Sequence, residues 1–280
     1  MKNEEKYIVF DEAMRSQLRQ KQLEILKLLI SICEKHNLTY FIVGGSALGS
    51  IRHGGFIPWD DDIDVALPRR DYMTLMAVGQ KELPLGFFLQ NHNTEAAYRN
   101  DFSKIRNSNT TYVEATIACL KINHGIYIDI FPIDGLPSGK LKRALLTCHK
   151  KVAKCYLGKD YLHQKNTWKR SIVLFIGRIL FHHKTPSRII QDLEDSYMRY
   201  PYESSDMVVC HGGAWGKLEQ CERTQYGQGV EGVFEGIKVR LPEKTHEYLS
   251  HKYGDYMKLP PEEKRVGHHY CVKFEIGDHK

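Results

Sequence analysis

The order of apolar and polar residues predicts a chain that alternates helices with short strands. Residues 9–36 contain no Pro or Gly, and their apolar side chains recur mostly at steps of three and four, which is typical of an amphipathic helix. Residues 38–43 form a β-branched and aromatic run that stops at a Gly-Gly pair, as a strand does before a turn. Ser46 then stands where it can cap a short helix that ends near Ile51. The pattern therefore predicts a strand, a glycine turn and a helix in succession.

The rest of the chain continues this alternation. Residues 52–61 predict a loop, Pro68 opens a helix to about residue 78, and residues 107–109 predict a polar turn. Further strands are predicted at 63–67, 87–90, 102–106, 111–114 and 126–131, a strand or hairpin at 232–241, and helices over 140–200, with breaks at Pro186 and Pro201, and over 242–253. Together these elements predict the α/β (α+β) class, with a mixed β-sheet flanked by helices.

The length and composition fit one large catalytic unit. The chain has 280 residues, of which 42% are hydrophobic and 26% charged, and this excludes collagen-like, coiled-coil and wholly disordered proteins. We expect residues 1–139 to hold the N-terminal helix and the core of the unit. Residues 140–200 are expected to form a basic helical insertion, and residues 201–280 to complete the same unit.

The cysteines and the N-terminus favour a cytoplasmic protein. The seven cysteines show no C-x-x-C spacing, which argues against a disulfide framework and against the common zinc modules. The first ten residues mix charged and polar side chains and lack the apolar centre of a signal peptide. Both features favour a reducing compartment.

Positive charge is concentrated in one segment. Residues 140–184 hold twelve Lys and Arg residues against a single acid, Asp160, whereas the net charge of the whole chain is +6. Such asymmetry predicts a polyanionic partner for this segment. Within it, residues 167–184 have an apolar body with cations at both ends, as a helix lying on an anionic membrane has. A buried core helix with solvated flanks is the alternative; nucleic acid is not expected, because no binding motif accompanies the charge.

An acidic run predicts a metal site. Asp60, Asp61, Asp62 and Asp64 lie within five positions. Residues two apart on a strand point to the same face, so Asp62 and Asp64 project together while the residue between them faces the core. Two ionised carboxylates so placed repel each other unless a cation lies between them, and hard oxygen ligands favour Mg²⁺ or Mn²⁺. A solvated acidic turn is the alternative.

Two companions favour the metal site over the acidic turn. Gly44, Gly45 and Ser46 lie between a strand and a helix N-terminus, where backbone N–H groups and the helix dipole bind anions. Asp129 lies inside the apolar strand 126–131, where a carboxylate is costly unless it is paired or metal-bound. A structural salt bridge or a cap at the strand end remains the alternative for Asp129.

The Gly-Gly-Ser turn, the Asp-x-Asp pair and the aspartate inside an apolar strand follow one another over residues 41–131. In this order they resemble the signature pattern of the nucleotidyltransferase fold. Longer segments at 44–72, 104–114, 125–137 and 234–269 resemble the LicD family, and only the first forty residues and the basic middle lie outside the likeness. The resemblance implies transfer of a phospho-alcohol from CDP-choline, or from another CDP-alcohol, to a hydroxyl of a cell-surface glycan precursor, with release of CMP. Phosphocholine is the expected cargo, and related fukutin-type proteins transfer ribitol phosphate. The acceptors of the family are lipid-linked, which places the expected membrane contact of residues 140–184 at the inner face of the cell membrane.

The resemblance also assigns roles to residues. It implies that Gly44, Gly45 and Ser46 bind the nucleotide phosphates and that the metal ligands are Asp62, Asp64 and Asp129, with Asp60 a weaker candidate and Asp61 nearby. Asp129 is also our hypothesis for the group that takes the proton of the attacking hydroxyl. Lys104 and Arg106, two apart on one strand face, are candidate ligands of the diphosphate, with an exposed basic strand edge as the alternative. Arg52 is a further phosphate candidate or an ordinary cation at a helix C-terminus.

The alcohol and the exact reaction stay open at this stage. A choline pocket needs aromatic faces or a carboxylate, and Trp59, Trp215, Tyr112 and Tyr127 are possible walls. His268 and His269 match the end of the family pattern, either near the acceptor or as a surface pair. One alternative function is a nucleotidyltransferase that moves NMP to a small molecule, protein or RNA and releases diphosphate. Another is an inactive binding protein that has kept the fold.

Overall fold

The computed structural model describes residues 7–162, 164–267 and 269–277. The helices are α1 (Glu12–Lys35), α2 (Gly44–His53), α3 (Arg69–Glu82), α4 (Lys140–Leu157), α5 (Trp168–Phe181), α6 (Pro186–Met198), α7 (Arg223–Tyr226) and α8 (Thr245–Tyr253). The strands are β1 (Phe41–Ile42), β2 (Asp64–Pro68), β3 (Phe87–Gln90), β4 (Ser103–Asn107), β5 (Thr111–Glu114), β6 (Ile126–Gly135), β7 (Met207–Cys210), β8 (Gln220–Glu222), β9 (Val230–Phe234), β10 (Ile237–Leu241) and β11 (Cys271–Glu275).

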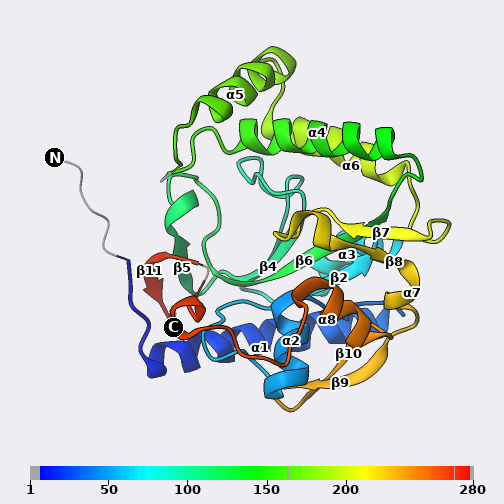
Figure 1. The fold of residues 1–280 in the computed structure, drawn as a ribbon. Coiled ribbons are helices and arrows are strands. Elements are labelled where there is room, and N and C mark those ends of the chain that lie inside the picture. The colour runs from blue at the N-terminus through cyan, green and yellow to red at the C-terminus, as the bar shows by residue number, and fades with distance from the viewer. Residues whose placement is uncertain (1–6, 163, 268, 278–280) are drawn as a thin grey trace.

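A mixed sheet forms the centre of the molecule, which confirms the predicted fold class. Its strands run in the order β1-β2-β6-β4-β3, and β7 and β8 extend it beside the end of β6. Strands β2 and β6 are parallel, whereas the other pairs in this sheet are antiparallel. Helix α1 packs on β4 and β6, and in Figure 1 α4 and α6 lie on the other side of the sheet from α1. The parallel pair β2–β6 is the part of the sheet that carries the acidic residues.

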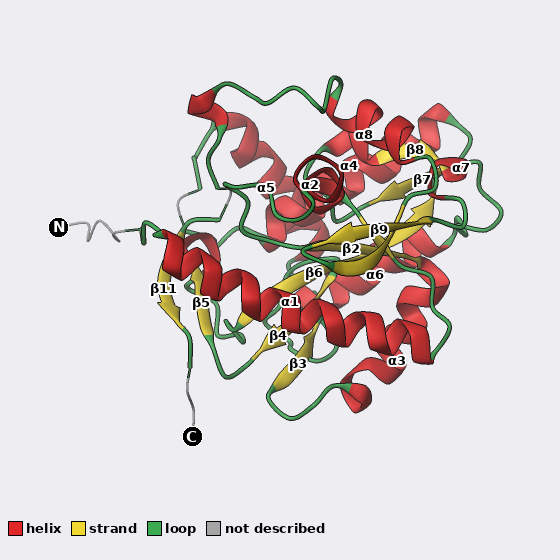
Figure 2. Ribbon diagram, turned by 90° about the horizontal axis from the view of Figure 1, so that it is seen from below, coloured by secondary structure: helices red, strands yellow, loops and turns green. Residues whose placement is uncertain are grey.

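The amphipathic helix at the start of the chain, α1, packs on one face of the sheet and contributes to the main apolar core. Ile25 and Leu29 of α1 are fully buried in the same apolar cluster as Ile128 and Ile130 of β6. Figure 2 shows α1 running along the sheet. Because side chains alternate along a strand, this packing leaves Asp129 on the opposite face of β6.

Helices α4, α5 and α6 form a layer with an apolar cluster of its own. It contains Val152 of α4, Phe181 of α5, and Ile190 and Leu193 of α6. Gly177 lets α5 approach α4 closely, since a Cβ at this position would lie 2.9 Å from the Cβ of Tyr156. We call α4, α5 and α6 the helical layer.

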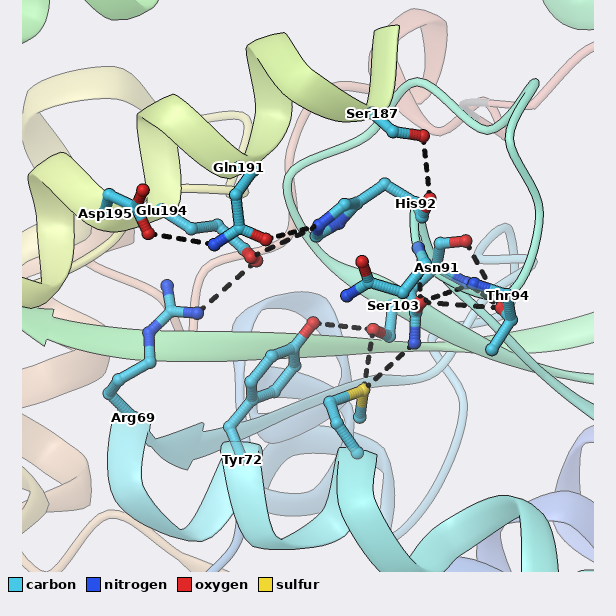
Figure 3. A network of polar contacts seen from close by, with 12 residues as sticks. Arg69, Tyr72, Asn91, His92, Thr94, Ser103, Ser187, Gln191, Glu194 and Asp195 are labelled. Atoms are coloured by element: carbon cyan, nitrogen blue, oxygen red, sulfur yellow. Dashed lines mark hydrogen bonds and ion pairs between the residues drawn. The ribbon is translucent and has the colours of Figure 1, made fainter.

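A buried polar network joins the helical layer to the sheet (Figure 3). Arg69, the first residue of α3, donates two hydrogen bonds of 2.7 Å to Asp134 of β6. Its third nitrogen lies 3.4 Å from Glu194 of α6, and a ring nitrogen of His92 lies 3.7 Å from the other oxygen of Glu194. Together these contacts compensate charges that would be costly to bury alone.

The structure corrects three details of the predicted elements. Helix α2 begins at Gly44 with Val43 as its N-cap, so Ser46 does not cap it; the Ser46 hydroxyl instead accepts a hydrogen bond of 2.9 Å from the backbone N–H of Asp64. Strand β1 is only two residues long. Strand β5 pairs with β11 rather than with the main sheet, and Figure 2 shows this ribbon beside the beginning of α1.

Candidate active site

A cavity of about 780 Å³ opens where the carboxyl-bearing strands meet α2 and α8. It brings together most of the residues that the sequence singled out. Those that line it are Gly44, Gly45, Arg52, Trp59, Asp60, Asp62, Asp64, Asp129, Trp215 and His269.

Three carboxylates converge because of the strand register. Asp64 lies directly opposite Asp129 in the parallel pair β2–β6, and the backbone N–H of Asp129 donates to the carbonyl of Ile63 over 2.9 Å. Asp62 offers a third carboxylate, and one oxygen from each of the three lies within 4.8 Å of the others. This arrangement suits a divalent cation that prefers hard oxygen ligands, as Mg²⁺ and Mn²⁺ do.

Two glycines bring the start of α2 against these carboxylates. A Cβ on Gly44 would lie 2.6 Å from Oδ2 of Asp64, and the φ of Gly44 is +59°. A Cβ on Gly45 would lie 2.6 Å from Oδ2 of Asp60. Gly44 is restricted to glycine by its positive φ and by the contact with Asp64. Its backbone N–H donates to the hydroxyl of Tyr248 over 3.1 Å and is not free to bind a ligand, whereas Gly45 is half-buried and lines the cavity.

The carboxylates of the cluster raise one another's pKa. Burial and the neighbouring carboxylates raise the pKa of Asp60 to about 8, and burial raises the pKa of Asp62 to about 6. The pKa of Asp64 is raised well above its usual value by burial and by the charges of Asp62 and Asp129. A divalent ion would favour the ionised forms, and the donor set therefore fits the predicted metal.

Lys104 and Arg106 are not where a ligand of the diphosphate would be. Both are buried, and neither is among the described residues that line the cavity. The Lys104 ammonium lies 2.8 Å from Oδ1 of Asp129 and 3.6 Å from Oε1 of Glu114. The Arg106 guanidinium donates to the side chain of Gln90 and to a backbone carbonyl. The exposed basic edge is wrong as well, since β4 is an inner strand of the sheet.

Lys104 instead supports the third carboxylate. Its ammonium lies 3.3 Å from the centre of the Tyr127 ring, and only 3% of the residue is exposed. Although burial of Glu114 acts in the opposite direction, the Lys104 charge lowers the pKa of Glu114 to about 2. The buried Lys104 thus forms an ion pair with Asp129, and Asp129 also lines the cavity.

The cations that line the cavity come from α2 and from the C-terminal part of the chain. Arg52 lines it, and one of its nitrogens donates to the carbonyl of Tyr256 over 2.8 Å. Lys252, Lys258 and Lys264 also line it and were not predicted. They lie in the segment 234–269 that carried the family resemblance, so the signal was present but gave no role to individual residues.

His269 faces the acidic run. Its Nδ1 lies 2.9 Å from Oδ1 of Asp61 and 3.8 Å from an oxygen of Asp62. Burial alone would lower the pKa of His269, but the hydrogen bond with Asp61 and the charge of Asp62 raise it well above its usual value. Asp61 thus lies beside the metal candidates, as expected, and His269 lines the cavity. His268 lies outside the described residues.

The structure separates the four aromatic candidates. Trp59 and Trp215 line the cavity, whereas Tyr112 and Tyr127 are 2% and 3% exposed and are not among the described residues at its wall. Tyr253, which was not predicted, lines it beside Trp215.

The helical layer carries an exposed apolar face. Six large side chains of α5 are 40–70% exposed, and their spacing puts them on one side of the helix. They are Trp168, Ile172, Phe175, Ile176, Ile179 and Leu180. A fully buried α5 is therefore wrong, since only its other side packs on the layer. Among the described residues, no helix is long and apolar enough to cross a membrane.

Comparisons with known proteins agree with this geometry. The family model "LicD/FKTN/FKRP, nucleotidyltransferase domain" matches residues 37–141. The lipopolysaccharide cholinephosphotransferase LicD of Haemophilus influenzae is 31% identical over 263 residues, which cover 90% of this chain and 96% of that protein. The ribitol 5-phosphate transferase FKRP of Homo sapiens is 38% identical over 48 residues, or 17% of this chain and 10% of that protein. The matched region includes the Gly-Gly turn and all three carboxylates.

Proposed function

The chain belongs to the LicD family, and from this we propose that it transfers phosphocholine from CDP-choline to a hydroxyl of a lipopolysaccharide-type glycan, releasing CMP. The observation that carries the proposal is the cavity itself. It joins a glycine turn suited to phosphates with the carboxylates of Asp62, Asp64 and Asp129, in a chain that aligns with nearly the whole of a cholinephosphotransferase.

The proposed reaction is an in-line displacement at phosphorus. The acceptor hydroxyl gives up its proton to water as its oxygen forms a bond to the phosphorus that carries choline. The bond from that phosphorus to the bridging oxygen breaks, and CMP leaves with that oxygen and its electron pair. A Mg²⁺ or Mn²⁺ ion held by the three carboxylates would neutralise charge on the transferring and leaving phosphates. The chain itself positions the donor, with the backbone N–H of Gly45 at the start of α2 and the cation of Arg52 at the phosphates.

Asp129 fits a ligand better than a proton acceptor. Its Oδ1 lies 2.8 Å from the Lys104 ammonium, and this ion pair keeps the carboxylate beside those of Asp62 and Asp64. We therefore propose Asp129 as a metal ligand held in place by Lys104, rather than as the base.

We further propose that the protein meets its lipid-linked acceptor at the cytoplasmic face of an anionic membrane, through residues 140–184. The exposed face of α5 supports this, because apolar side chains at the surface are covered favourably by the boundary between head groups and acyl chains. The basic residues around it supply the attraction to anionic lipid. Figure 1 shows α5 at the edge of the molecule, beyond α4 and far from α1.

The decisive experiment is an assay of product. The purified protein is incubated with Mg²⁺, a lipid-linked glycan and CDP-choline, CDP-ethanolamine, CDP-ribitol or CDP-glycerol in turn, and CMP release is followed. We expect release from CDP-choline, and a loss of ~10³-fold in rate in Asp62→Asn or Asp64→Asn, because the charge compensation of several kcal/mol at the phosphates is lost. Diphosphate release from a nucleoside triphosphate would favour the nucleotidyltransferase alternative. CDP-choline binding without turnover of any donor would favour the inactive binding protein.

A further inference from the structure

Two aromatic rings from different elements meet at a right angle on the wall of the cavity. Trp215 precedes the short 3₁₀ turn Gly216–Glu219, and Tyr253 is the last residue of α8. Their ring centroids are 5.2 Å apart and their planes meet at 83°. Trp215 is 48% exposed although it lines a cavity, so a ligand that covered its ring would remove a large apolar area from water.

A buried ion pair fixes this corner. Glu219 and Lys252, each 5% exposed at the side chain, lie 2.8 Å apart and join the loop of Trp215 to the helix of Tyr253. The other oxygen of Glu219 accepts the backbone N–H of Trp215 over 3.1 Å. A Cβ on Gly213 would collide with the same carboxylate, so the loop is tight on both sides of the pair. The two rings are therefore held in place before a ligand arrives, which lowers the entropy cost of binding.

The charge around the corner suits a cation that has no hydrogen to donate. A trimethylammonium group carries a permanent positive charge and is attracted by the faces of Trp and Tyr rings. Burial raises the pKa of Tyr253 well above its usual value, and its ring therefore stays a neutral phenol. The Lys252 ammonium would repel a second cation, but Glu219 neutralises it, and the exposed carboxylate of Asp255 also lines the cavity.

Trp59, the other tryptophan that lines the cavity, already has a cation beside its ring. The Arg265 guanidinium lies 5.7 Å from the centre of the Trp59 ring, so a cation already covers that side chain. The corner, in contrast, is linked to the start of α2 beside the acidic cluster, because the Tyr248 hydroxyl lies 3.4 Å from Nζ of Lys252 and accepts the backbone N–H of Gly44 over 3.1 Å. A donor whose phosphates lie at the carboxylates would thus have its alcohol within the same cavity as the corner.

We infer that the corner between Trp215 and Tyr253 binds the trimethylammonium group of the donor and selects it over uncharged alcohols. The inference rests on the proposed phosphocholine transfer and names the residues that recognise its alcohol. Arg52, Lys258 and Lys264 also line the cavity, and we assign them to the phosphates because cations attract these and repel a trimethylammonium group.

Binding of CMP and CDP-choline, measured by titration calorimetry with Mg²⁺ present, tests the inference. In Trp215→Leu we expect CDP-choline to bind ~10-fold more weakly, from the loss of one cation–π face, while CMP affinity is unchanged. Trp215→Phe keeps an aromatic face and should recover most of the affinity. Trp168→Leu is the matched control, because Trp168 is also exposed, at 70%, but lies on α5 outside the cavity lining. Unchanged CMP binding shows that each variant is folded.

The outcomes separate failure of the subsite from failure of the proposed function. Equal weakening of CMP and CDP-choline in Trp215→Leu would show that the ring stacks on the cytosine base, and would overturn the inference. Unchanged binding of both ligands would overturn it as well. If the unmodified protein released CMP from CDP-ribitol and not from CDP-choline, the proposed donor itself would be refuted. Normal use of CDP-choline with an unchanged KM in Trp215→Leu would refute the subsite alone.

Discussion

Replacing two side chains on the exposed face of α5 should detach the protein from anionic membranes. The change is the double variant Phe175→Gln, Ile179→Gln, in which both residues lie on the same side of the helix and are 65% and 59% exposed. Neither contributes to the buried cluster of the helical layer, so the fold should be kept. The purpose is to remove apolar area that only a membrane would cover.

The size of the effect follows from that area. Complete burial of one such side chain is worth about 2 kcal/mol, and more than half of each is available at the surface, so the pair contributes about 2 kcal/mol to partitioning. This corresponds to a ~30-fold weaker association with vesicles. The basic residues of the segment are kept in the variant, and the remaining binding should fall steeply as salt is raised.

The assay is co-sedimentation with vesicles of phosphatidylglycerol and phosphatidylethanolamine. Leu85→Gln is the matched control, because Leu85 is an isolated apolar side chain that is 102% exposed and lies just before β3, far along the chain from α5. It should bind vesicles like the unmodified protein. If the double variant sedimented as well as the control, the exposed face of α5 would not be the membrane contact. A loss that also occurred with vesicles lacking anionic lipid would refute the electrostatic part of the proposal.

Three further predictions concern the acidic cluster. Gly44→Ala should reduce transfer by at least ~10²-fold, because its Cβ would lie 2.6 Å from Oδ2 of Asp64 and the φ of +59° disfavours alanine; an unchanged rate of CMP release would contradict the close approach. Lys104→Met should lower the free energy of unfolding by about 3 kcal/mol, because Asp129 and Glu114 lose their buried cation. Urea denaturation measures this change, and a loss smaller than the experimental error would show that the ion pair is dispensable. Mg²⁺ should raise the melting temperature of the protein but not that of Asp64→Asn, and an equal rise in both would place the ion elsewhere.

The local sequence pattern was enough to predict the three carboxylates of the acidic site, but not the residues that contact them. The Asp-x-Asp spacing and the apolar strand around Asp129 predicted three carboxylates on two strands, since strand periodicity is a local property. The parallel register that puts Asp64 opposite Asp129 depends on the whole sheet. Lys104 illustrates the limit: its strand face was predicted, but whether that face is open or covered is decided by neighbouring strands.

The same limit applies to the far end of the chain. Tyr253 and Lys252 reach the cavity from α8, which follows the predicted carboxylates by more than a hundred positions. Ser46 shows a competing local choice, because a serine after a glycine turn suits an N-cap, and the helix nevertheless begins at Gly44. The Ser46 hydroxyl instead accepts the backbone N–H of Asp64, a residue distant in the sequence, which local pattern does not reveal.

The ion pairs of Arg69 bear on how the helical layer could have arisen. Arg69 follows directly on β2, the strand that begins with Asp64, and it contacts Glu194 of α6 as well as Asp134 of β6. Deleting residues 140–200 would therefore remove one buried partner of a cation that adjoins the acidic strand β2. Because Arg69 would keep only one of its two buried carboxylate partners, gain or loss of the layer is expected to need a compensating change in the sheet. The layer and the sheet are expected to melt in a single transition and to evolve together.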